Sequence, residues 1–506
     1  MKKKLVLGSA MALVLAGCAT LPETGSETLS SLSKLGTVNE RYQSYNIEMV
    51  EVTGGRFWAP YGGPEGEVYR ERPPIDLTDT RLRNLAKNLG PAMVRVSGTW
   101  ANNTYLAAEG EQLTEPPAGY KQILTRDQWR NVVAFSRAVD APIVTSFAVS
   151  AGTRGPDGVW KTEQAQRIAD LTAEAGGSLF AAEFFNEPNV PSATIGMPTD
   201  YDAVRYGAEF RMFRDWARRA VPSMKIIGPG GVGEGGLLKN MPVNALGEHV
   251  ATEDMMKQNP NSVDAVSYHF YGSVSQRCKF LNIGTAIKED ALKPEWLDRT
   301  LLDFGVYGGL RDKFEPGKGL WNTETAQAAC GGSPWASTFL DSFRYLNQNA
   351  ALAQKGVQVV MHNTLAASDY ALIDRDTMMP RPNYYAAVLW SRLMGPVVLA
   401  SPRSPSPDLR IYAHCTRGQT GSVTLLALNL GAAPQTVSLA APGQSWVMTG
   451  MPLDTRNVLI NGKEAVVSSD GRLGDLDGVP VSGDVAIPGQ SIAFVSVDGA
   501  NNPACR

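Results

Sequence analysis

Short β-rich apolar runs alternate with amphipathic stretches over residues 45–365 of this chain, and no other sequence feature limits its possible folds as strongly. Eight runs can be counted: 46–52, 92–97, 143–149, 179–185, 225–228, 263–270, 320–324 and 357–362. The stretches between them with helical periodicity include 79–89, 126–139, 163–175, 201–220 and 338–354. Strands that alternate with helices favour a parallel sheet, and eight repeats are typical of a closed barrel. We therefore expect an α/β fold, a (β/α)8 TIM barrel, over residues 36–395.

The pattern of apolar and polar residues changes after residue 393. Residues 401–407 form a Pro/Ser-rich break, and short alternating segments follow at 422–429, 435–439 and 491–497, separated by Gly, Pro and Asn. This pattern predicts an all-β sandwich domain over residues 396–506. Residues 37–45 could add one strand to that domain before the barrel begins.

The first 17 residues are typical of a bacterial lipoprotein signal peptide. Residues 2–4 are lysines, residues 5–16 are apolar, and Leu15-Ala16-Gly17-Cys18 has the form of a lipobox, which predicts cleavage before Cys18 and lipid attachment to its sulfur. An ordinary secretory signal with a chance cysteine is the alternative. Residues 18–35 are then expected to be a flexible tether.

Export follows from either interpretation of the N-terminal segment. Beyond this segment, no apolar stretch approaches the roughly 20 residues that span a bilayer, so the lipid would be the membrane attachment. Ala19 follows the cysteine in place of an aspartate. We expect a lipid-anchored protein of the cell envelope, on the outer membrane where the sorting rule of enteric bacteria applies.

Charge and histidine usage argue against several classes of partner. The 47 basic and 50 acidic residues nearly balance, and no long run of Lys or Arg marks a track for nucleic acid. The four histidines are scattered, and none stands at zinc-binding spacing from a cysteine: His249, His269, His362 and His414. We expect neither a metal nor another cofactor.

Four cysteines remain besides Cys18, and an even number in an exported chain indicates disulfides. Three pairings are possible. We favour Cys278–Cys330 because these residues follow the neighbouring sixth and seventh expected strands. Cys415–Cys505 is then the second pair, with both residues in the C-terminal region.

Two glutamates stand at the ends of the fourth and seventh expected strands, where such barrels carry catalytic groups. Glu187 belongs to the sequence Asn-Glu-Pro-Asn at 186–189, and Glu324 to Thr-Glu-Thr at 323–325. Pro188 restricts the residue before it, so we expect Glu187 in extended geometry, pointing into the barrel mouth. Two carboxyl groups that flank one bond are what cleavage of a glycosidic bond requires. Asn186 can donate its amide to a sugar hydroxyl.

An acid after strand four with a nucleophile after strand seven resembles clan A retaining glycosidases. The resemblance implies that Glu324 attacks the anomeric carbon and that Glu187 is the general acid and then the general base, with the carboxyl groups roughly 5–5.5 Å apart. The pKa of Glu187 should be raised in the free protein and fall once Glu324 is esterified.

The sequence also resembles glycoside hydrolase family 79, the heparanase and β-glucuronidase family, over nearly all of the mature chain. The matching segments are 185–189, 321–326 with Gly-Gly at 331–332, 357–362, 368–370 and 382–385. The resemblance implies a glucuronate beside the broken bond. Its carboxylate would be held by the backbone amide of Gly331, with Gly332 as a second donor, and by Tyr370. Cys330 stands where the heparanase pattern has glycine.

The same resemblance implies roles for four further residues. Glu48 on the first strand would bind sugar hydroxyls, and Thr99 after the second strand would line the same pocket. His269 and Tyr271 share one face of a strand because side chains alternate. In the family this pair faces the nucleophile, so Tyr271 is expected to hydrogen-bond Glu324, whereas a packed core histidine is the alternative for His269.

Together these observations predict a retaining exo-β-glucuronidase that removes β-linked glucuronate, or its 4-O-methyl form, from glycans or glycosides. Exo action is favoured because nothing basic marks a groove for a long sulfated chain. Three alternatives stay open: another clan A activity such as a β-xylosidase, an endo-acting heparanase-like enzyme, and a surface glycan-binding lipoprotein.

Overall fold

The computed structural model describes residues 28–64, 66–240 and 249–506. The predicted signal peptide, Cys18 and the first part of the tether therefore lie outside the described residues. Within the described ranges, no helix has both the length and the hydropathy that crossing a bilayer requires.

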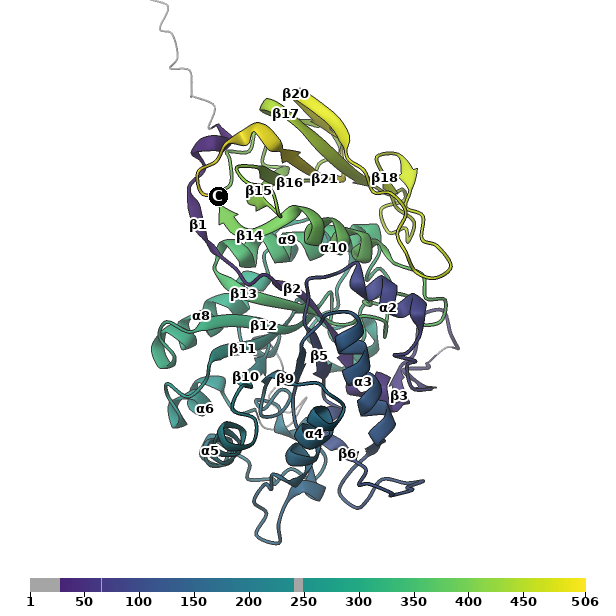
Figure 1. The fold of residues 1–506 in the computed structure, drawn as a ribbon, viewed down its shortest axis with the longest axis vertical. Coiled ribbons are helices and arrows are strands. Elements are labelled where there is room, and N and C mark those ends of the chain that lie inside the picture. Colours follow the sequence, from purple (N-terminus) through teal and green to yellow (C-terminus); the bar gives the residue numbers. More distant parts are fainter. Residues whose placement is uncertain (1–27, 65, 241–248) are drawn as a thin grey trace, which may run out of the picture.

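Eight parallel strands close into a barrel, which confirms the predicted (β/α)8 architecture (Figure 1). In chain order they are β2 (Gln43–Glu48), β5 (Val94–Ser97), β8 (Ile143–Thr145), β9 (Leu179–Ala182), β10 (Lys225–Val232), β11 (Ala265–Tyr271), β12 (Gly319–Ala326) and β13 (Val357–His362). The barrel closes where β13 pairs with β2. Side chains from seven of these strand regions, among them Val144, Trp321 and Met361, form one apolar cluster. This packed layer fills part of the interior, so the open end of the barrel is left for polar groups.

The helices that surround the barrel follow the expected positions to within two residues. They include α2 (Thr80–Lys87), α3 (Arg126–Ala138), α4 (Glu163–Glu174), α5 (Ala203–Ala220) and α9 (Phe339–Gln354), and the later repeats add α6 (Thr252–Gln258) and α8 (Thr300–Phe314). α3 begins at a reciprocal capping box between Thr125 and Gln128. α5 buries Phe210, Phe213 and Trp216, the residues that the sequence assigns to its core face.

The first barrel strand differs from the prediction of 46–52. β2 ends at Glu48, and the short helix α1 (Met49–Thr53) follows directly. The Glu48 side chain caps the backbone of Glu51, and Glu51 Oε2 accepts a hydrogen bond from Glu48 N at 2.8 Å. These two reciprocal bonds satisfy amides at the start of the helix and stop the strand at Glu48.

The C-terminal domain is an antiparallel β-sheet of nine strands. They are β1 (Lys34–Thr37), β14 (Met394–Leu399), β15 (Leu409–Thr416), β16 (Val423–Asn429), β17 (Gln435–Thr449), β18 (Leu459–Ile460), β19 (Lys463–Glu464), β20 (Val479–Ile487) and β21 (Ser491–Val497). The first part of β17 folds over with β20, so Val437 and Val485 join Leu425 and Val495 in a core between two layers. α9 and α10 (Pro382–Leu393) lie between this sheet and the barrel (Figure 1).

The prediction that the tether covers residues 18–35 is wrong at its C-terminal end. β1 pairs with β14, and Leu32 is buried in the core of the β domain. Asn502 Nδ2 donates to the carbonyl oxygens of Leu29 and Leu32. Residues 28–37 are therefore part of the domain, and the added strand lies at 34–37 and not at 37–45.

Both predicted disulfides are present. Cys278–Cys330 joins the loops after β11 and β12, and Cys415–Cys505 joins β15 to the C-terminus. The parallel neighbours β11 and β12 bring their following loops together, which is the physical basis of the first pairing.

Candidate active site

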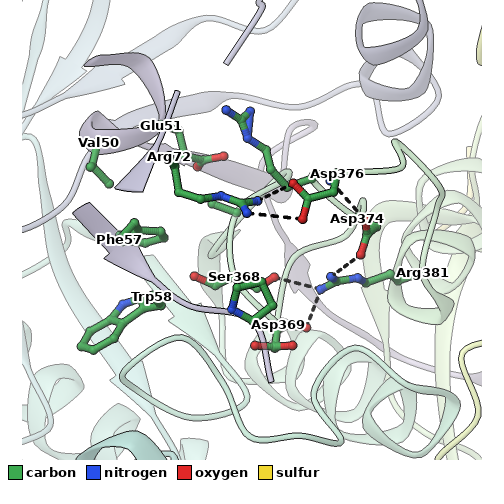
Figure 2. Close-up of a pocket in the computed structure, with 13 residues that line it drawn as sticks. Val50, Glu51, Phe57, Trp58, Arg72, Ser368, Asp369, Asp374, Asp376 and Arg381 are labelled. Carbon is green, nitrogen blue, oxygen red and sulfur yellow. Dashed lines mark hydrogen bonds and ion pairs between the residues drawn. The ribbon is translucent and has the colours of Figure 1, made fainter. Parts of the chain in front are cut away.

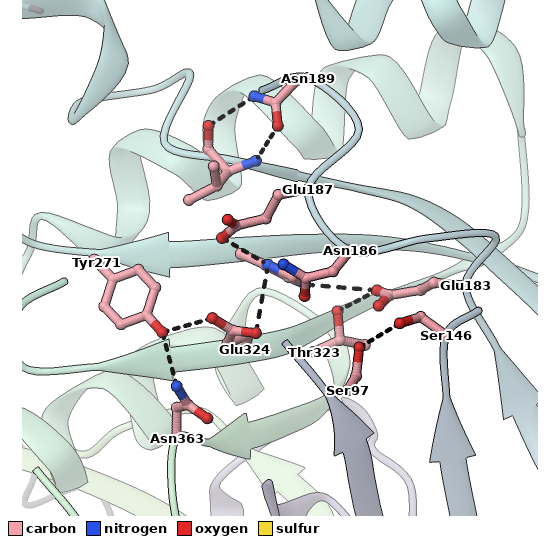
Figure 3. A network of polar contacts seen from close by, with 12 residues as sticks. Ser97, Ser146, Glu183, Asn186, Glu187, Asn189, Tyr271, Thr323, Glu324 and Asn363 are labelled. Atoms are coloured by element: carbon pink, nitrogen blue, oxygen red, sulfur yellow. Dashed lines mark hydrogen bonds and ion pairs between the residues drawn. The ribbon is translucent and has the colours of Figure 1, made fainter. Parts of the chain in front are cut away.

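Glu324 lies on β12, and both of its carboxylate oxygens are engaged. Arg95 Nη1 donates to Oε2 at 2.8 Å. The Tyr271 hydroxyl donates to Oε1 at 2.7 Å, the bond expected from the sequence (Figure 3). Burial by itself would raise the pKa of Glu324, but the His269 and Arg95 cations and the Tyr271 hydroxyl hold that pKa below its ordinary value. Glu324 is therefore an ionised carboxylate at neutral pH, the state that a nucleophile needs.

Glu187 lies in the loop that follows β9, with its side chain 18% exposed. Its φ is +51°, so the extended conformation predicted from Pro188 is wrong. The proline ring disfavours the right-handed helical region for the preceding residue, and the left-handed conformation avoids that clash as well. Burial, and then the nearby charge of Glu324, raise the pKa of Glu187, while a hydrogen bond with His269 opposes the shift. A raised pKa is the property that a general acid needs.

The spacing of the two glutamates fits a retaining mechanism. One carboxylate oxygen of Glu187 and one of Glu324 lie within 4.8 Å of each other. Retaining glycosidases hold their carboxyl groups roughly 5–5.5 Å apart, whereas inverting enzymes need roughly 6.5–9.5 Å to admit a water.

His269, fully buried on β11, lies among three carboxylates. Its Nδ1 is 3.1 Å from Glu187 Oε1 and 3.8 Å from Glu324 Oε2, and its Nε2 is 3.7 Å from Glu183 Oε1. Burial would lower the pKa of His269, but the carboxylates raise it to about 9. The imidazole is therefore cationic at neutral pH, and it lies within 3.8 Å of a carboxylate oxygen of each proposed catalytic glutamate.

Arg95 and Glu183 form a buried ion pair that the sequence prediction missed. Arg95 on β5 is 1% exposed, and its Nη2 donates to Glu183 Oε2 and Asn186 Oδ1, both at 2.8 Å. Glu183 also accepts from Thr323 Oγ1 at 2.7 Å (Figure 3). Both charged residues stand inside otherwise apolar strand runs, 92–97 and 179–185. That was the available signal, because charged side chains are almost never fully buried unless they are paired.

The sequence prediction also missed Asn363, which follows β13. Its side-chain amide connects three other side chains of the site. Its Nδ2 lies 2.9 Å from Glu48 Oε1, 3.0 Å from the Tyr271 hydroxyl and 3.1 Å from the Tyr370 hydroxyl. Burial and the charge of Glu324 raise the pKa of Glu48 well above its ordinary value. Glu48 Oε2 is buried and has no hydrogen-bond partner among the described residues, so it can accept from or donate to a ligand.

The remaining predicted site residues differ in the contacts that they make within the protein. Asn186 Nδ2 is buried without a partner among the described residues, so it can donate to a sugar. Gly331 has φ +80°, and a Cβ on it would lie 2.8 Å from the Trp58 ring. Gly332 N instead donates to the Ala328 carbonyl oxygen at 3.2 Å, which occupies the second amide suggested for the uronate. Thr99 is half-buried, and its carbonyl accepts from Asn103 Nδ2 at 3.3 Å.

Among the described residues, one trio could also surround a cation: Glu187, His269 and Glu324. One ligand atom from each of them lies within 4.8 Å of those from the other two. Arg95 already donates to Glu324 Oε2, and its Nη2 lies 3.2 Å from His269 Nε2. A metal ion would have to lie next to this buried guanidinium and a protonated imidazole. The trio therefore fits acid–base chemistry better than metal binding.

Several known proteins are similar to this chain in sequence. No protein-family model matches the chain. Heparanase of Mus musculus is 26% identical over 491 residues, covering 87% of this chain and 84% of that protein. Heparanase-like protein 1 of Arabidopsis thaliana is 27% identical over 375 residues, with 70% and 65% covered. Inactive heparanase-2 of Homo sapiens is 26% identical over 393 residues, with 71% and 62% covered.

Two solved structures with a similar fold carry the names of glycosidases. A 4-O-α-L-rhamnosyl-β-D-glucuronidase from Fusarium oxysporum 12S superposes with a TM-score of 0.65 at 14% identity, covering 93% of this chain and 100% of that one. The family 51 arabinofuranosidase from Xanthomonas axonopodis pv. citri gives 0.61 at 16% identity, with 92% and 98% covered. At such identities the likeness concerns the fold alone.

The barrel, its paired glutamates and the sequence relatives together support a retaining glycoside hydrolase. Over most of its length the chain is similar to a heparanase and to a heparanase-like protein, at 26% and 27% identity.

Proposed function

We propose that the chain is a retaining exo-β-glucuronidase, with Glu187 as general acid/base and Glu324 as nucleophile. The observation that carries the proposal is the pair itself. One carboxylate oxygen of each lies within 4.8 Å of the other, and their pKa values are displaced in opposite directions, up for Glu187 and down for Glu324.

In the first step, protonated Glu187 donates its proton to the leaving oxygen while ionised Glu324 attacks the anomeric carbon. The bond to the aglycone breaks, and an ester forms between the sugar and Glu324. Esterification removes the negative charge that raises the pKa of Glu187, so that pKa falls. Glu187 then takes a proton from water, the water attacks the ester, and the sugar leaves with its configuration retained.

Neutral donors would hold the glucuronate carboxylate. The Tyr370 hydroxyl oxygen accepts from Asn363 Nδ2, so its own proton remains available for a carboxylate oxygen. The amide of Gly331 is the second donor, and Asn186 Nδ2 would bond the sugar 2-hydroxyl. Hydrogen bonds to an ionised acceptor are stronger than neutral ones, so two neutral donors can select a uronate.

The first test compares p-nitrophenyl β-glucuronide with the β-glucoside and β-xyloside. The wild type is expected to cleave the glucuronide, and Glu324→Gln should abolish this cleavage. Glu315→Gln is the matched control, because Glu315 is a buried carboxylate that accepts from Ser262 N away from the site. Cleavage of the xyloside or glucoside alone would reject the uronate assignment and leave a different clan A glycosidase.

A non-catalytic role is the second candidate, because two relatives carry the name inactive heparanase-2. Its chemistry would be binding of a glucuronate-containing glycan without turnover. Calorimetric titration of the same glycan into the wild type and Glu324→Gln separates the two. Binding by both proteins without product from either favours the second candidate, and product analysis of any turnover distinguishes exo from endo action.

We also propose that the protein is exported and held in the cell envelope, on the outer membrane, by a lipid on Cys18. The two disulfides support an oxidising compartment, because such bonds are rare in the cytosol. Membrane fractions should contain the wild type, and Cys18→Ala should move it to the soluble fraction. Recovery of Cys18→Ala in the membrane fraction at the wild-type level would reject the anchor.

A further inference from the structure

Three consecutive residues of the loop after β12 have positive φ angles: Cys330 (+62°), Gly331 (+80°) and Gly332 (+83°). Gly332 N donates to the Ala328 carbonyl oxygen at 3.2 Å, and the Gly331 carbonyl oxygen accepts from Asp369 N at 3.0 Å. The N–H of Gly331 makes no hydrogen bond to any of the described residues. It is therefore available to a ligand, and what matters is the direction in which it points.

Two side chains from the loop after β11 hold the peptide group that contains this N–H. Ser275 Oγ donates to the Cys330 carbonyl oxygen at 2.8 Å, and Arg277 Nη1 donates to the same oxygen at 3.3 Å. In a trans peptide such as this one, the C=O and the N–H point in opposite directions. Because the carbonyl is directed at these two side chains, the Gly331 N–H points away from them.

Arg277 fixes several other groups around the same turn. Its Nη1 also donates to the Gly332 carbonyl oxygen at 2.9 Å, and its Nη2 pairs with Asp369. Its Nε donates to the Ala59 carbonyl oxygen at 3.1 Å, and the centre of the Tyr61 ring lies 3.8 Å from its Cζ. The side chain is 4% exposed. A guanidinium presents its donors in a rigid fork, so one side chain can hold all of these groups in place.

Asp369 connects this arrangement to Tyr370, the second proposed donor to the uronate carboxylate. Its side chain pairs with Arg277, and Tyr370 follows it in sequence. From the other side, Arg381 Nη1 donates to the carbonyl oxygens of Ser368 and Asp369 at 2.8 and 2.7 Å (Figure 2). The backbone that leads into Tyr370 is therefore held between two arginines.

We propose that Arg277 and Ser275 are positioning residues that direct the Gly331 N–H at the sugar carboxylate and so produce a preference for uronates. The inference rests on the proposed glucuronidase and deepens it. Arg277 lies on the carbonyl side of the peptide, so the ligand meets the N–H and not the guanidinium. A hydrogen bond donated to a carbonyl also polarises the peptide and strengthens its N–H as a donor. A neutral sugar has no charged group at this position, so its binding depends much less on this N–H.

The experiment compares the binding of two iminosugars by isothermal titration calorimetry. Both mimic the sugar ring, and one carries a carboxylate where glucuronate has it, whereas the other carries a hydroxymethyl group. The wild type should bind the carboxylate compound about a hundredfold more tightly, because each of two hydrogen bonds to a charged group contributes roughly tenfold. In Ser275→Ala this preference should fall about fivefold, the size of one lost hydrogen bond. In Arg277→Lys it should fall about tenfold, because an ammonium cannot replace the fork. Neither variant should change the affinity for the hydroxymethyl compound.

Kinetics with p-nitrophenyl β-glucuronide give a second readout. The carboxylate is bound alike in the ground state and the transition state, so both variants should raise KM and leave kcat nearly unchanged. Two controls change groups of the same kind elsewhere. Ser136→Ala removes a hydroxyl that donates to the Ala141 carbonyl oxygen at 2.6 Å, and Arg410→Lys alters an arginine that pairs with Asp298. Both controls should keep the wild-type preference and the wild-type KM.

A preference that Ser275→Ala and Arg277→Lys both retain would overturn this inference and leave the glucuronidase in place. Equal weakening of both iminosugars would also overturn it, because it would show a structural role alone. Full preference in Arg277→Lys together with its loss in Arg277→Met would do the same, since charge and not donor geometry would then be required. A wild type that binds the two compounds equally would instead reject the uronate site of the proposed function, and this inference with it.

Discussion

Arg95 is the side chain that holds the charges of the site together. It bonds Glu183, Glu324 and Asn186 from a position that is 1% exposed, so its positive charge offsets two buried carboxylates. His269 adds a second cation between Glu187 and Glu324. The state of each glutamate therefore depends on neighbours from other strands as much as on its own place in the chain.

Replacing Arg95 by methionine should damage both folding and activity. Breaking a buried ion pair from one side typically costs about 3–5 kcal/mol, because Glu183 and Glu324 are left charged and unpaired. The loss of an aligned donor to the nucleophile should reduce kcat/KM by about 10²–10³. Denaturant unfolding and steady-state kinetics measure the two effects. Arg130→Met, which removes an exposed pair, is the control and should change unfolding by at most about 1 kcal/mol.

The pH profile of kcat/KM should shift upward in His269→Gln. Glu324 must be ionised, so activity falls as pH drops through its pKa, and Glu187 must be protonated, so activity falls as pH rises through its pKa. The His269 cation lowers both pKa values. Its removal should therefore move the acidic and alkaline limbs to higher pH. His414→Gln changes a buried neutral histidine of the β domain and should not move them. An unshifted or downward-shifted profile would contradict this role of His269.

The loop after β9 places Glu187, and two asparagines hold that loop from opposite sides. β9 ends at Ala182, five residues before the glutamate. Asn102 bonds both the N–H and the carbonyl of Asn186 at 2.9 Å. Asn189 bonds both backbone groups of Val232 on β10, at 3.0 and 2.9 Å. The position of the acid is therefore set by side-chain to backbone bonds and not by continuation of the strand.

Asn189→Ala should loosen this loop. Two buried backbone groups of Val232 would lose their partners, a cost of about 1–3 kcal/mol in unfolding free energy for each unsatisfied group. A displaced Glu187 should lower kcat about tenfold with a smaller change in KM. Asn457→Ala, on the exposed surface, provides the comparison and should leave kcat and unfolding near wild type. Wild-type kcat in Asn189→Ala would show that the loop holds Glu187 without this residue.

At the scale of the whole molecule, the barrel and the β domain share one core. Almost all of α9 is buried, and residues from the barrel, from α10 and from the facing strands of the sheet belong to one hydrophobic cluster. The two disulfides lie at different places in this arrangement. Cys278–Cys330 adjoins Gly331, and both residues of Cys415–Cys505 belong to the core of the β domain.

Replacing the two disulfides one at a time should distinguish an effect on stability from an effect on activity. Replacing either pair by serine should lower the free energy of unfolding, typically by about 2–4 kcal/mol. Only the Cys278/Cys330 double variant should also lower kcat/KM for the glucuronide, because the amide of Gly331 is next to it in sequence. Thermal unfolding and kinetics at a temperature where both variants are folded check this. Equal activity of the two double variants would indicate that the loop keeps its shape without the bond.

The sequence by itself determined the repeating strands and helices, the β domain and the two glutamates, and it favoured the disulfide pairing that the structure has. Each of these depends on local periodicity, on residue type at a strand end, or on the known order of strands in a barrel. Tertiary structure alone decided the left-handed conformation of Glu187, the early end of β2, and the meeting of Arg95, Glu183 and Asn363 with the glutamates. These features depend on side chains that lie far apart in sequence. A buried charge is stable only beside its partner, and barrel closure is what brings such partners together.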